Sequence, residues 1–333
     1  MRNLMKRRRA QSFFVKLCLA VFAVGAIAAY GKFGSVRGAY DAITGYLFPE
    51  DVMFTVAESA PPILEEDEEG LKTGSVSESA NIFGQQNRDD EKNETYTPEI
   101  RNDTSFVLDL DALEASGVSL KSGDEPQVLI VHTHTSESYA PDEEYYYVQD
   151  DNDRTLDTNF NVVAVGNRVE QLLQDAGISV IHDKTINDYP SYNGSYNRML
   201  DIIELYMAEY PSISVVLDIH RDAVIYEDGS RFAASTVIDN KSAAQVMLVV
   251  GTDEGGLPHD GWERNLSFAL DIQSVADERY PGLMRPVNLR SSRFNQHVSP
   301  GALIVEVGAS GNTLGEALYG AELFTKALIE TLK

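Results

Sequence analysis

Residues 127–139 read Gln-Val-Leu-Ile-Val-His-Thr-His-Thr-Ser-Glu-Ser-Tyr. The apolar run at residues 127–132 predicts a buried β-strand. His132 ends this run, and His134 and Glu137 follow it closely. The segment therefore predicts a buried strand whose carboxyl end carries side chains able to bind a metal or to move a proton.

Similar apolar runs alternate along the chain with segments whose apolar residues recur at helical spacing. We predict further strands at residues 178–181, 213–219, 236–238, 246–250 and 302–307. We predict helices at residues 159–174, 196–210, 266–278 and 313–332. Strands that are apolar throughout and alternate with helices are typical of parallel sheets covered on both faces. The sequence therefore predicts an α/β fold with a mostly parallel central sheet flanked by helices.

The N-terminus carries a basic cluster, Arg2 and residues 6–9, followed by a mostly apolar stretch at residues 13–30. A basic flank before an apolar segment of this length orients a membrane helix with its N-terminus inside and the following chain outside. The competing interpretation is a cleaved signal peptide, because Ala26-Ile27-Ala28 resembles a cleavage site. We predict an uncleaved N-terminal transmembrane helix, which makes this a single-pass protein of the cell membrane with an extracytoplasmic domain.

Composition changes after the predicted anchor. Residues 61–97 contain few apolar residues and include the acidic run at 65–69, which predicts a solvated linker. We therefore divide the chain into three parts. They are a basic flank and membrane anchor at 1–31, a juxtamembrane segment and acidic linker at 32–100, and a catalytic domain at 101–333.

Charge and cysteine content narrow the function further. The formal net charge of −25 argues against a nucleic-acid partner, because a polyanion would be repelled. A hydrophobic content of 43% fits a globular protein and is too low for a polytopic membrane protein. The single cysteine, Cys18, lies within the apolar N-terminal run, so no cysteine-ligated zinc site can form.

Side chains with ligand chemistry follow or interrupt three of the predicted strands. His134 follows the first strand, His220 ends another, and Glu306 lies inside the last. The carboxyl ends of parallel strands meet at one side of a sheet, so these residues can converge. A glutamate in an apolar strand is costly unless it is paired or lies near a metal. These residues predict a zinc site in which His134, His220 and one carboxylate are ligands and Glu306 is the general base.

The remaining polar candidates have weaker contexts. His182 is followed by charged residues and is expected at the surface, whereas His259 and His297 lie in loops that could line the same cleft. Ser136 stands beside Glu137 but lacks the G-x-S-x-G elbow that would present it as a nucleophile. The sequence also contains no Walker loop, no G-x-G-x-x-G and no H-E-x-x-H motif.

Several blocks together resemble the stage II sporulation protein P family. The first is His-Thr-His-Thr-Ser-Glu-Ser-Tyr at residues 132–139. The others are Asp-Ile-His-Arg-Asp-Ala (218–223), Gly-Thr-Asp (251–253), Arg-Phe-Asn-Gln-His (293–297) and Ile-Val-Glu-Val-Gly-Ala-Ser-Gly-Asn-Thr (304–313). The blocks lie in the expected order within residues 105–333, and the basic and apolar N-terminus also resembles that family.

The resemblance implies a cell-wall hydrolase of endospore-forming bacteria. Such proteins are N-acetylmuramoyl-L-alanine amidases that act on peptidoglycan, and an endopeptidase activity on its peptide cross-links is also attributed to them. The resemblance implies action during engulfment of the forespore, at the septum and the engulfing membrane, in a complex with stage II sporulation proteins D and M. It further implies a catalytic domain similar to the zinc N-acetylmuramoyl-L-alanine amidases, with Zn²⁺ as the cofactor.

The same resemblance assigns roles to individual residues. It puts His134 at the first zinc ligand, His220 at the later ligand and Glu306 at the catalytic glutamate. The middle ligand of those amidases is a glutamate at the start of the next helix. The helix predicted from residue 159 has none there, and only Asp157 is close.

Glu137 is the better candidate for the middle ligand, because it belongs to the family's own block. His132 is a further candidate, either as a ligand or as a partner of one. His297 is a candidate for stabilising the developing oxyanion.

Two other functions remain open. One is a catalytically idle wall-binding scaffold, although such a module has no need for a costly glutamate at 306. The other is a zinc peptidase that acts only on stem peptides, because such enzymes use the same types of ligand.

Overall fold

The computed structural model of this protein describes residues 96–333 except residues 122, 149–152 and 227. The predicted anchor, the juxtamembrane segment and most of the acidic linker lie outside the described residues. Within the described part of the chain, no helix is long and apolar enough to cross a membrane.

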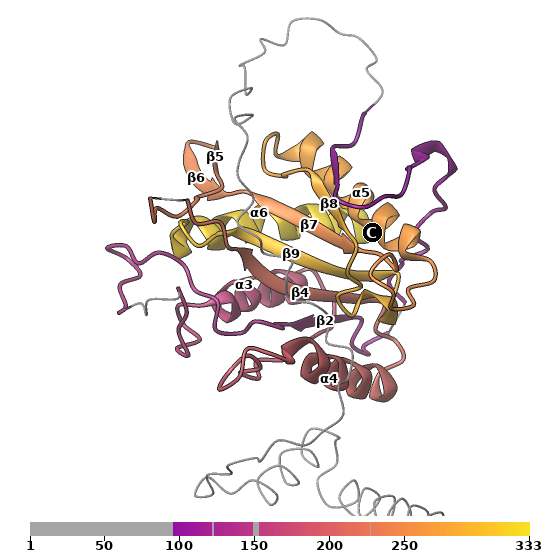
Figure 1. Ribbon diagram of the computed structural model, residues 1–333, viewed down its shortest axis with the longest axis horizontal. Coiled ribbons are helices and arrows are strands. Elements are labelled where there is room, and N and C mark those ends of the chain that lie inside the picture. Colours follow the sequence, from indigo (N-terminus) through magenta and orange to yellow (C-terminus); the bar gives the residue numbers. More distant parts are fainter. Residues whose placement is uncertain (1–95, 122, 149–152, 227) are drawn as a thin grey trace, which may run out of the picture. The chain divides into compact units, whose positions relative to one another are not determined.

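The fold is built on a seven-stranded sheet in the order β1-β8-β7-β9-β4-β2-β3 (Figure 1). The strands are β1 (Ile100–Asn102), β2 (Val128–Val131), β3 (Val180–His182), β4 (Val215–Asp222), β7 (Val246–Gly251), β8 (Val287–Arg290) and β9 (Gly301–Ala309). Every pairing in this sheet is parallel except that between β7 and β9. The carboxyl ends of β2, β4 and β9 therefore meet at one edge, and those of β7 and β8 lie at the opposite edge.

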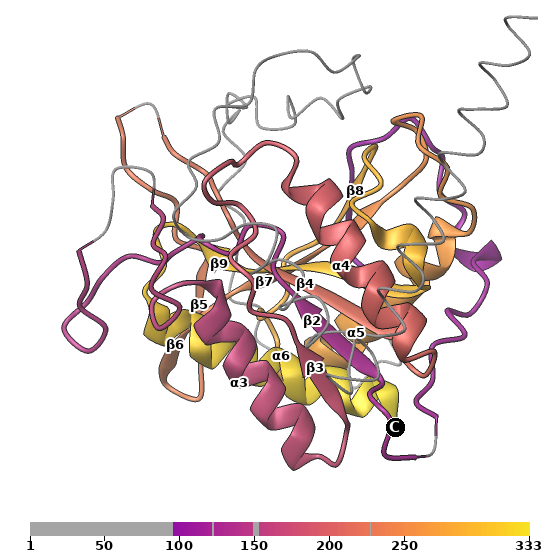
Figure 2. The ribbon, with the colours of Figure 1, turned by 90° about the horizontal axis from the view of Figure 1, so that it is seen from below.

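Helices cover the two faces of the sheet unequally. They are α3 (Val162–Asp175), α4 (Ser195–Glu209), α5 (Trp262–Arg279) and α6 (Leu314–Leu332). Residues of α3, α5 and α6 share one hydrophobic core, and α4 packs on the other face with a smaller core (Figure 2). In β4, Leu217 and Ile219 face the three helices, whereas Val216 faces α4. Because side chains alternate along a strand, Asp218 and His220 lie on the α4 face.

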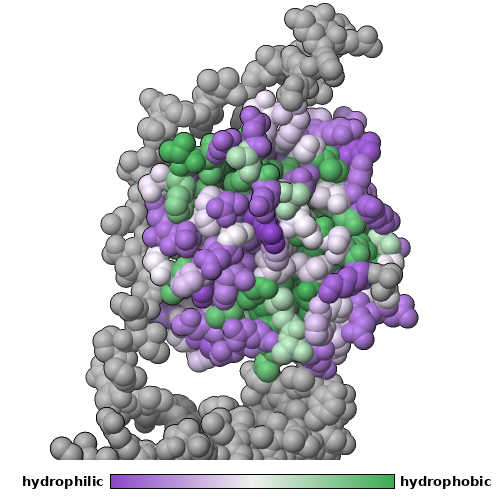
Figure 3. Space-filling view, turned by 90° about the vertical axis from the view of Figure 1, so that its right-hand side faces the viewer, coloured by the Kyte–Doolittle hydropathy of each residue, from purple (hydrophilic) through white to green (hydrophobic). Residues whose placement is uncertain are grey.

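A two-stranded antiparallel hairpin, β5 (Ser235–Ile238) and β6 (Lys241–Ala244), lies outside the main sheet. Strands β2 and β7 are buried along their whole length, as expected for strands covered on both faces. On the side of the molecule seen in Figure 3, hydrophobic residues occur in small groups between hydrophilic ones. The largest hydrophobic cluster is buried between the sheet and helices α3, α5 and α6.

Side chains fix where two of the helices begin. The Asn161 side chain accepts a hydrogen bond from the backbone N of Val163 at 2.9 Å, which caps α3. Thr313 and Glu316 form a capping box at the start of α6. The backbone N of Val162, the first residue of α3, donates to the carbonyl oxygen of Glu137 at 2.9 Å. The first turn of α3 is thereby tied to the segment that follows β2.

The predicted α/β class, with a central sheet flanked by helices, is confirmed. Strands β1 and β8, the first two in the sheet order, were not predicted. Polar residues interrupt their apolar pattern, namely Arg101, Asn102, Asn288 and Arg290. The reversed direction of β7 was not predicted either. Hydrophobic periodicity identifies a buried strand but carries no information about its direction.

A glycine in α6 allows this helix to approach the hairpin closely. A Cβ atom added at Gly320 would lie 2.2 Å from the carbonyl oxygen of Ala244. We expect Gly320→Ala to lower the free energy of unfolding by about 1–3 kcal/mol, because backbone atoms must shift to relieve the overlap. The matched control is Gly315→Ala in the same helix, where the nearest atom lies at 3.5 Å and the substitution should be neutral or stabilising. Urea unfolding followed by circular dichroism would contradict this expectation if the two variants were equally stable.

Candidate functional site

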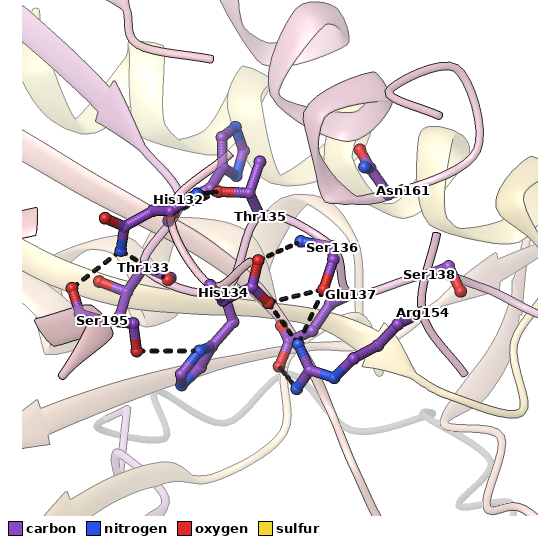
Figure 4. A network of polar contacts seen from close by, with 12 residues as sticks. His132, Thr133, His134, Thr135, Ser136, Glu137, Ser138, Arg154, Asn161 and Ser195 are labelled. Carbon is purple, nitrogen blue, oxygen red and sulfur yellow. Dashed lines mark hydrogen bonds and ion pairs between the residues drawn. The ribbon is translucent and has the colours of Figure 1, made fainter. Parts of the chain in front are cut away.

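The segment after β2 forms a turn that is held by its threonines. The backbone N and Oγ1 of Thr133 donate to the two carboxylate oxygens of Asp218, at 2.8 and 2.6 Å. Thr135 Oγ1 donates to the carbonyl oxygen of Thr185 at 2.7 Å. Figure 4 shows that the His134 ring points to the opposite side of this turn from His132. The two histidines of the His-Thr-His segment therefore lie in different environments.

His134 is buried, and neighbouring side chains fix its ring orientation. Its Nδ1 lies 3.3 Å from Ser195 Oγ (Figure 4). Tyr192 stacks on the ring with centroids 4.3 Å apart, and Tyr196 meets the ring edge at 5.6 Å. Burial lowers the pKa of His134 to about 4, although the Glu137 charge opposes this shift. The imidazole is therefore neutral near pH 7, which is the form that binds metals.

His220 lies between two carboxylates. Its Nδ1 is 3.3 Å from Glu137 Oε2, and its Nε2 is 2.9 Å from Asp218 Oδ1. The rings of His220 and His134 meet edge to face with centroids 5.3 Å apart. This contact brings the end of β4 against the turn that follows β2.

The charges in this cluster depend on one another. Burial would lower the pKa of His220, but Asp218 and Glu137 outweigh it and raise this pKa well above its ordinary value. Burial would raise the pKa of Glu137, but the charges of His220 and Arg221 bring it below its usual range. The pKa of Asp218 is lowered in the same way, since burial is outweighed by His220 and by the hydrogen bonds from Thr133. The two carboxylates therefore favour the protonated form of the His220 imidazole, and metal binding at this ring would release that proton.

Glu137 is positioned from three sides. Its Oε2 accepts a hydrogen bond from the backbone N of Arg221 at 3.2 Å, and its Oε1 lies 3.8 Å from Arg154 Nη2 (Figure 4). Its carbonyl oxygen accepts from the first residue of α3. Glu137 therefore lies beside the start of this helix in space, although it precedes the helix by many residues in sequence. The alternative carboxylate, Asp157, is exposed and accepts a hydrogen bond from the backbone N of Asn159.

Glu306 lies next to His220 in the register of β9 and β4, and next to Met247 in the register of β9 and β7. The side chain keeps part of its surface exposed, but its Oε2 is buried and has no hydrogen-bond partner. Burial raises the pKa of Glu306 to about 8, with the His220 charge opposing. A carboxyl group with this pKa can exchange a proton near neutral pH.

The side chains around His220 suit a zinc ion. Imidazole nitrogens and carboxylate oxygens are common zinc ligands. The 3.3 Å between His220 Nδ1 and Glu137 Oε2 is close to the separation of two ligands that each lie about 2.1 Å from one tetrahedral zinc ion. In the described part of the chain, no group of three His, Cys, Asp or Glu side chains is already arranged to hold a metal ion, so zinc binding would require these side chains to move.

His132 does not reach this cluster. It is fully buried on the α3 side of the sheet, where its Nδ1 lies 2.9 Å from the carbonyl oxygen of Ile219. Its Nε2 lies 2.8 Å from His182 Nε2, and His182 Nδ1 lies 3.0 Å from Glu170 Oε2. The prediction that His182 lies at the surface is wrong, because only 8% of this residue is exposed. The charged residues that follow His182 suggested exposure, but the histidine itself is the one buried residue of strand β3.

His297 does not reach the cluster either. It lies in a short 3₁₀ helix, η2 (Gln296–Val298), which precedes the first residue of β9. Glu306 lies six positions into this strand, roughly 16 Å from its start at the usual rise per residue. The His297 ring instead lies beside that of His259, with centroids 6.5 Å apart. Stabilising an oxyanion requires a donor within about 3 Å of it, so neither histidine belongs to this site.

Asp218 and Tyr196 were not found from the sequence. Asp218 is a buried carboxylate two positions before His220, and the strand period of two indicates that both share a face. The argument from the cost of a buried charge, which singled out Glu306, applies equally to Asp218. Tyr196 gave no sequence signal, because its position depends on how α4 packs.

The profile of the family "Stage II sporulation protein P (SpoIIP)" matches residues 49–329. The chain belongs to the stage II sporulation protein P family. It is 29% identical over 208 residues to stage II sporulation protein P of Bacillus subtilis (strain 168). That match covers 59% of this chain and 48% of the relative, so it spans about half of the relative's length.

Solved structures with a similar fold include three N-acetylmuramoyl-L-alanine amidases. The enzyme of Mycobacterium smegmatis has a TM-score of 0.38 and 13% identity, over 63% of this chain and 96% of its own. The enzyme of Clostridium difficile 630 has a TM-score of 0.37 and 12% identity, over 63% of this chain and 95% of its own. The enzyme of Nostoc punctiforme has a TM-score of 0.35 and 11% identity, over 64% of this chain and 97% of its own. A likeness of this size supports no assignment of activity or of residue roles.

The position of His182 leads to a stability prediction. Replacing His182 by Ala leaves His132 Nε2 without a partner and opens a cavity, so we expect a loss of about 2–4 kcal/mol in the free energy of unfolding. The control is His297→Ala, which changes an exposed histidine and should cost less than about 0.5 kcal/mol. Similar urea midpoints for the two variants would show that the buried histidine pair adds nothing to stability.

Proposed function

We propose that this chain is a zinc-dependent peptidoglycan hydrolase that cleaves the amide bond between N-acetylmuramic acid and L-alanine. The observation that carries the proposal is the grouping of His134, Glu137 and His220, with Glu306 beside them on the same face of the sheet. Membership of the stage II sporulation protein P family supports a role in sporulation.

The residues of the cluster have distinct tasks in this proposal. His134, Glu137 and His220 hold the zinc ion, and Asp218 orients the His220 ring through its other nitrogen. The zinc ion, when bound, makes a water molecule more acidic and polarises the substrate carbonyl. Tyr192 and Ser195 keep the His134 ring in one orientation.

Glu306 moves the proton in this proposal. It takes a proton from the water that attacks the carbonyl carbon, and it returns this proton to the amide nitrogen as the carbon–nitrogen bond breaks. The products are a muramic acid with a free carboxylate and a peptide with a free amino group on L-alanine. The buried, unpaired Oε2 and the partly exposed remainder of Glu306 suit a group that faces both the protein and the substrate.

The setting of the enzyme is also part of the proposal. The basic and apolar N-terminus would anchor the chain in the cell membrane with the catalytic domain outside the cytoplasm, at the septum and the engulfing membrane. Stage II sporulation proteins D and M are the proposed partners. The anchor rests on the residue pattern of the N-terminus, and the septal location and the partners rest on the sequence resemblance.

Zinc content tests the ligand assignment. We expect His134→Ala and His220→Ala to reduce the zinc bound after dialysis by roughly tenfold or more, because each removes a ligand. His132→Ala should keep its zinc wherever it remains folded, since this ring lies on the other side of the sheet. Elemental analysis of the folded variants provides the measurement. Equal zinc loss in the folded His132→Ala chain would contradict the assignment.

Digestion of purified peptidoglycan tests the activity. We expect Glu306→Gln to slow cleavage by roughly 10²–10⁴-fold with its zinc retained, because the amide cannot act as a general base. Glu330→Gln is the control, since this exposed carboxylate pairs with Arg279 at the surface. Mass spectrometry of the released peptides provides the measurement.

The products distinguish the alternatives. Peptides that begin with a free L-alanine amino group support the amidase. Cuts found only within the stem peptides would show a zinc peptidase. Binding to the wall without release of any fragment, equally with and without Glu306, would show a scaffold.

A further inference from the structure

Tyr196 is the second residue of α4, the helix on the sheet face that carries the site. Its ring meets the edge of His134, with centroids 5.6 Å apart and planes at 88°. It also packs against Phe294, with centroids 5.7 Å apart, and against the small hydrophobic cluster that Met247, Val249 and Ile304 form on the sheet. The phenol ring therefore lies between a proposed zinc ligand and strand β9.

These contacts place Tyr196 over the part of the sheet that carries Glu306. Met247 is the register partner of Glu306 across the β7–β9 pairing, and Ile304 lies two residues before Glu306 on the same face. The carbonyl oxygen of Tyr196 accepts a hydrogen bond from Asn295 Nδ2 at 2.8 Å, which holds the first turn of α4 in place. The ring is thus positioned by the sheet, by α4 and by the loop before β9.

The hydroxyl group of Tyr196 carries its proton near neutral pH, because an ordinary tyrosine loses it only at about pH 10. A protonated phenol is a hydrogen-bond donor, and it is the kind of side chain that stabilises negative charge on an oxygen.

We propose that the Tyr196 hydroxyl donates a hydrogen bond to the carbonyl oxygen of the scissile amide as negative charge develops on it. This inference rests on the proposed amidase function. Tyr196 would then stabilise the developing oxyanion, the role for which the sequence analysis named His297. His297 lies near the start of β9 and away from Glu306.

The hydrogen bond changes during the reaction, but its proton is not transferred. When the water oxygen bonds to the carbonyl carbon, an electron pair of the C=O bond moves to the oxygen, and the hydrogen bond from Tyr196 strengthens. When the carbon–nitrogen bond breaks, the C=O bond reforms, the nitrogen takes its proton from Glu306, and the hydrogen bond weakens again. An interaction that is strongest in the transition state raises kcat more than it lowers KM.

The test is Tyr196→Phe in the full chain, because phenylalanine keeps the ring contacts and removes only the hydroxyl. With a soluble, uncross-linked muramoyl-peptide glycan as substrate, we expect kcat to fall roughly 10²–10³-fold while KM stays within about twofold. Zinc content and melting temperature should match the wild type. The control Tyr210→Phe removes a hydroxyl at the end of the same helix that donates to Glu209, and it should leave kcat unchanged.

A second measurement separates this role from simple packing. In the Glu306→Gln chain, adding Tyr196→Phe should leave the affinity for the uncleaved glycan unchanged, because the hydrogen bond matters only in the transition state. The proposal is overturned if Tyr196→Phe keeps at least half of the wild-type kcat. It is also overturned if zinc content or glycan affinity falls as much as kcat does.

The result that would refute the proposed amidase function differs from the result that would refute the role of Tyr196. A wild-type chain with bound zinc that releases no peptide with a free L-alanine amino group would refute the amidase, and the role of Tyr196 with it. An active wild type and an equally active Tyr196→Phe chain would refute the role of Tyr196 alone.

Discussion

His220 lies at the end of a buried strand between Asp218 and Glu137, and the rest of the site is arranged around this ion cluster. Removing one partner of a buried ion pair leaves a charge without compensation, at a cost of about 3–5 kcal/mol. Asp218 is in turn held by Thr133 from the turn after β2. The turn, strand β4 and the Glu137 side chain must therefore all be in place together, which fixes the geometry of the site.

The direction of the strands decides which residues can join this cluster. Strands β2, β4 and β9 are parallel, so their carboxyl ends bring His134, His220 and Glu306 to one edge. Strand β7 runs the other way, and the chain after β7 and β8 emerges at the opposite edge. His259 and His297 lie there and pack against each other. A sheet with two directions thus separates the histidines into two groups.

The His-Thr-His segment serves both faces of the sheet. His132 enters the core beside α3, where Gly166 leaves room for two imidazole rings; a Cβ atom at Gly166 would lie only 2.7 Å from His182 and 2.8 Å from His132. His134 turns to the α4 side and meets Tyr192, Tyr196 and His220. One histidine therefore packs in the core, and the other lies among the polar and aromatic side chains of the candidate site.

The sequence by itself determined the α/β class, the buried strands and the three polar positions His134, His220 and Glu306. Apolar runs and the cost of buried charge are local properties that can be read without coordinates. Only the tertiary structure decided that His132 faces the core, that His297 lies at the far edge, and that Glu137 lies beside the start of α3. These outcomes depend on strand direction and on the path of the chain through its turns. Both are set by packing between distant segments rather than by local sequence pattern.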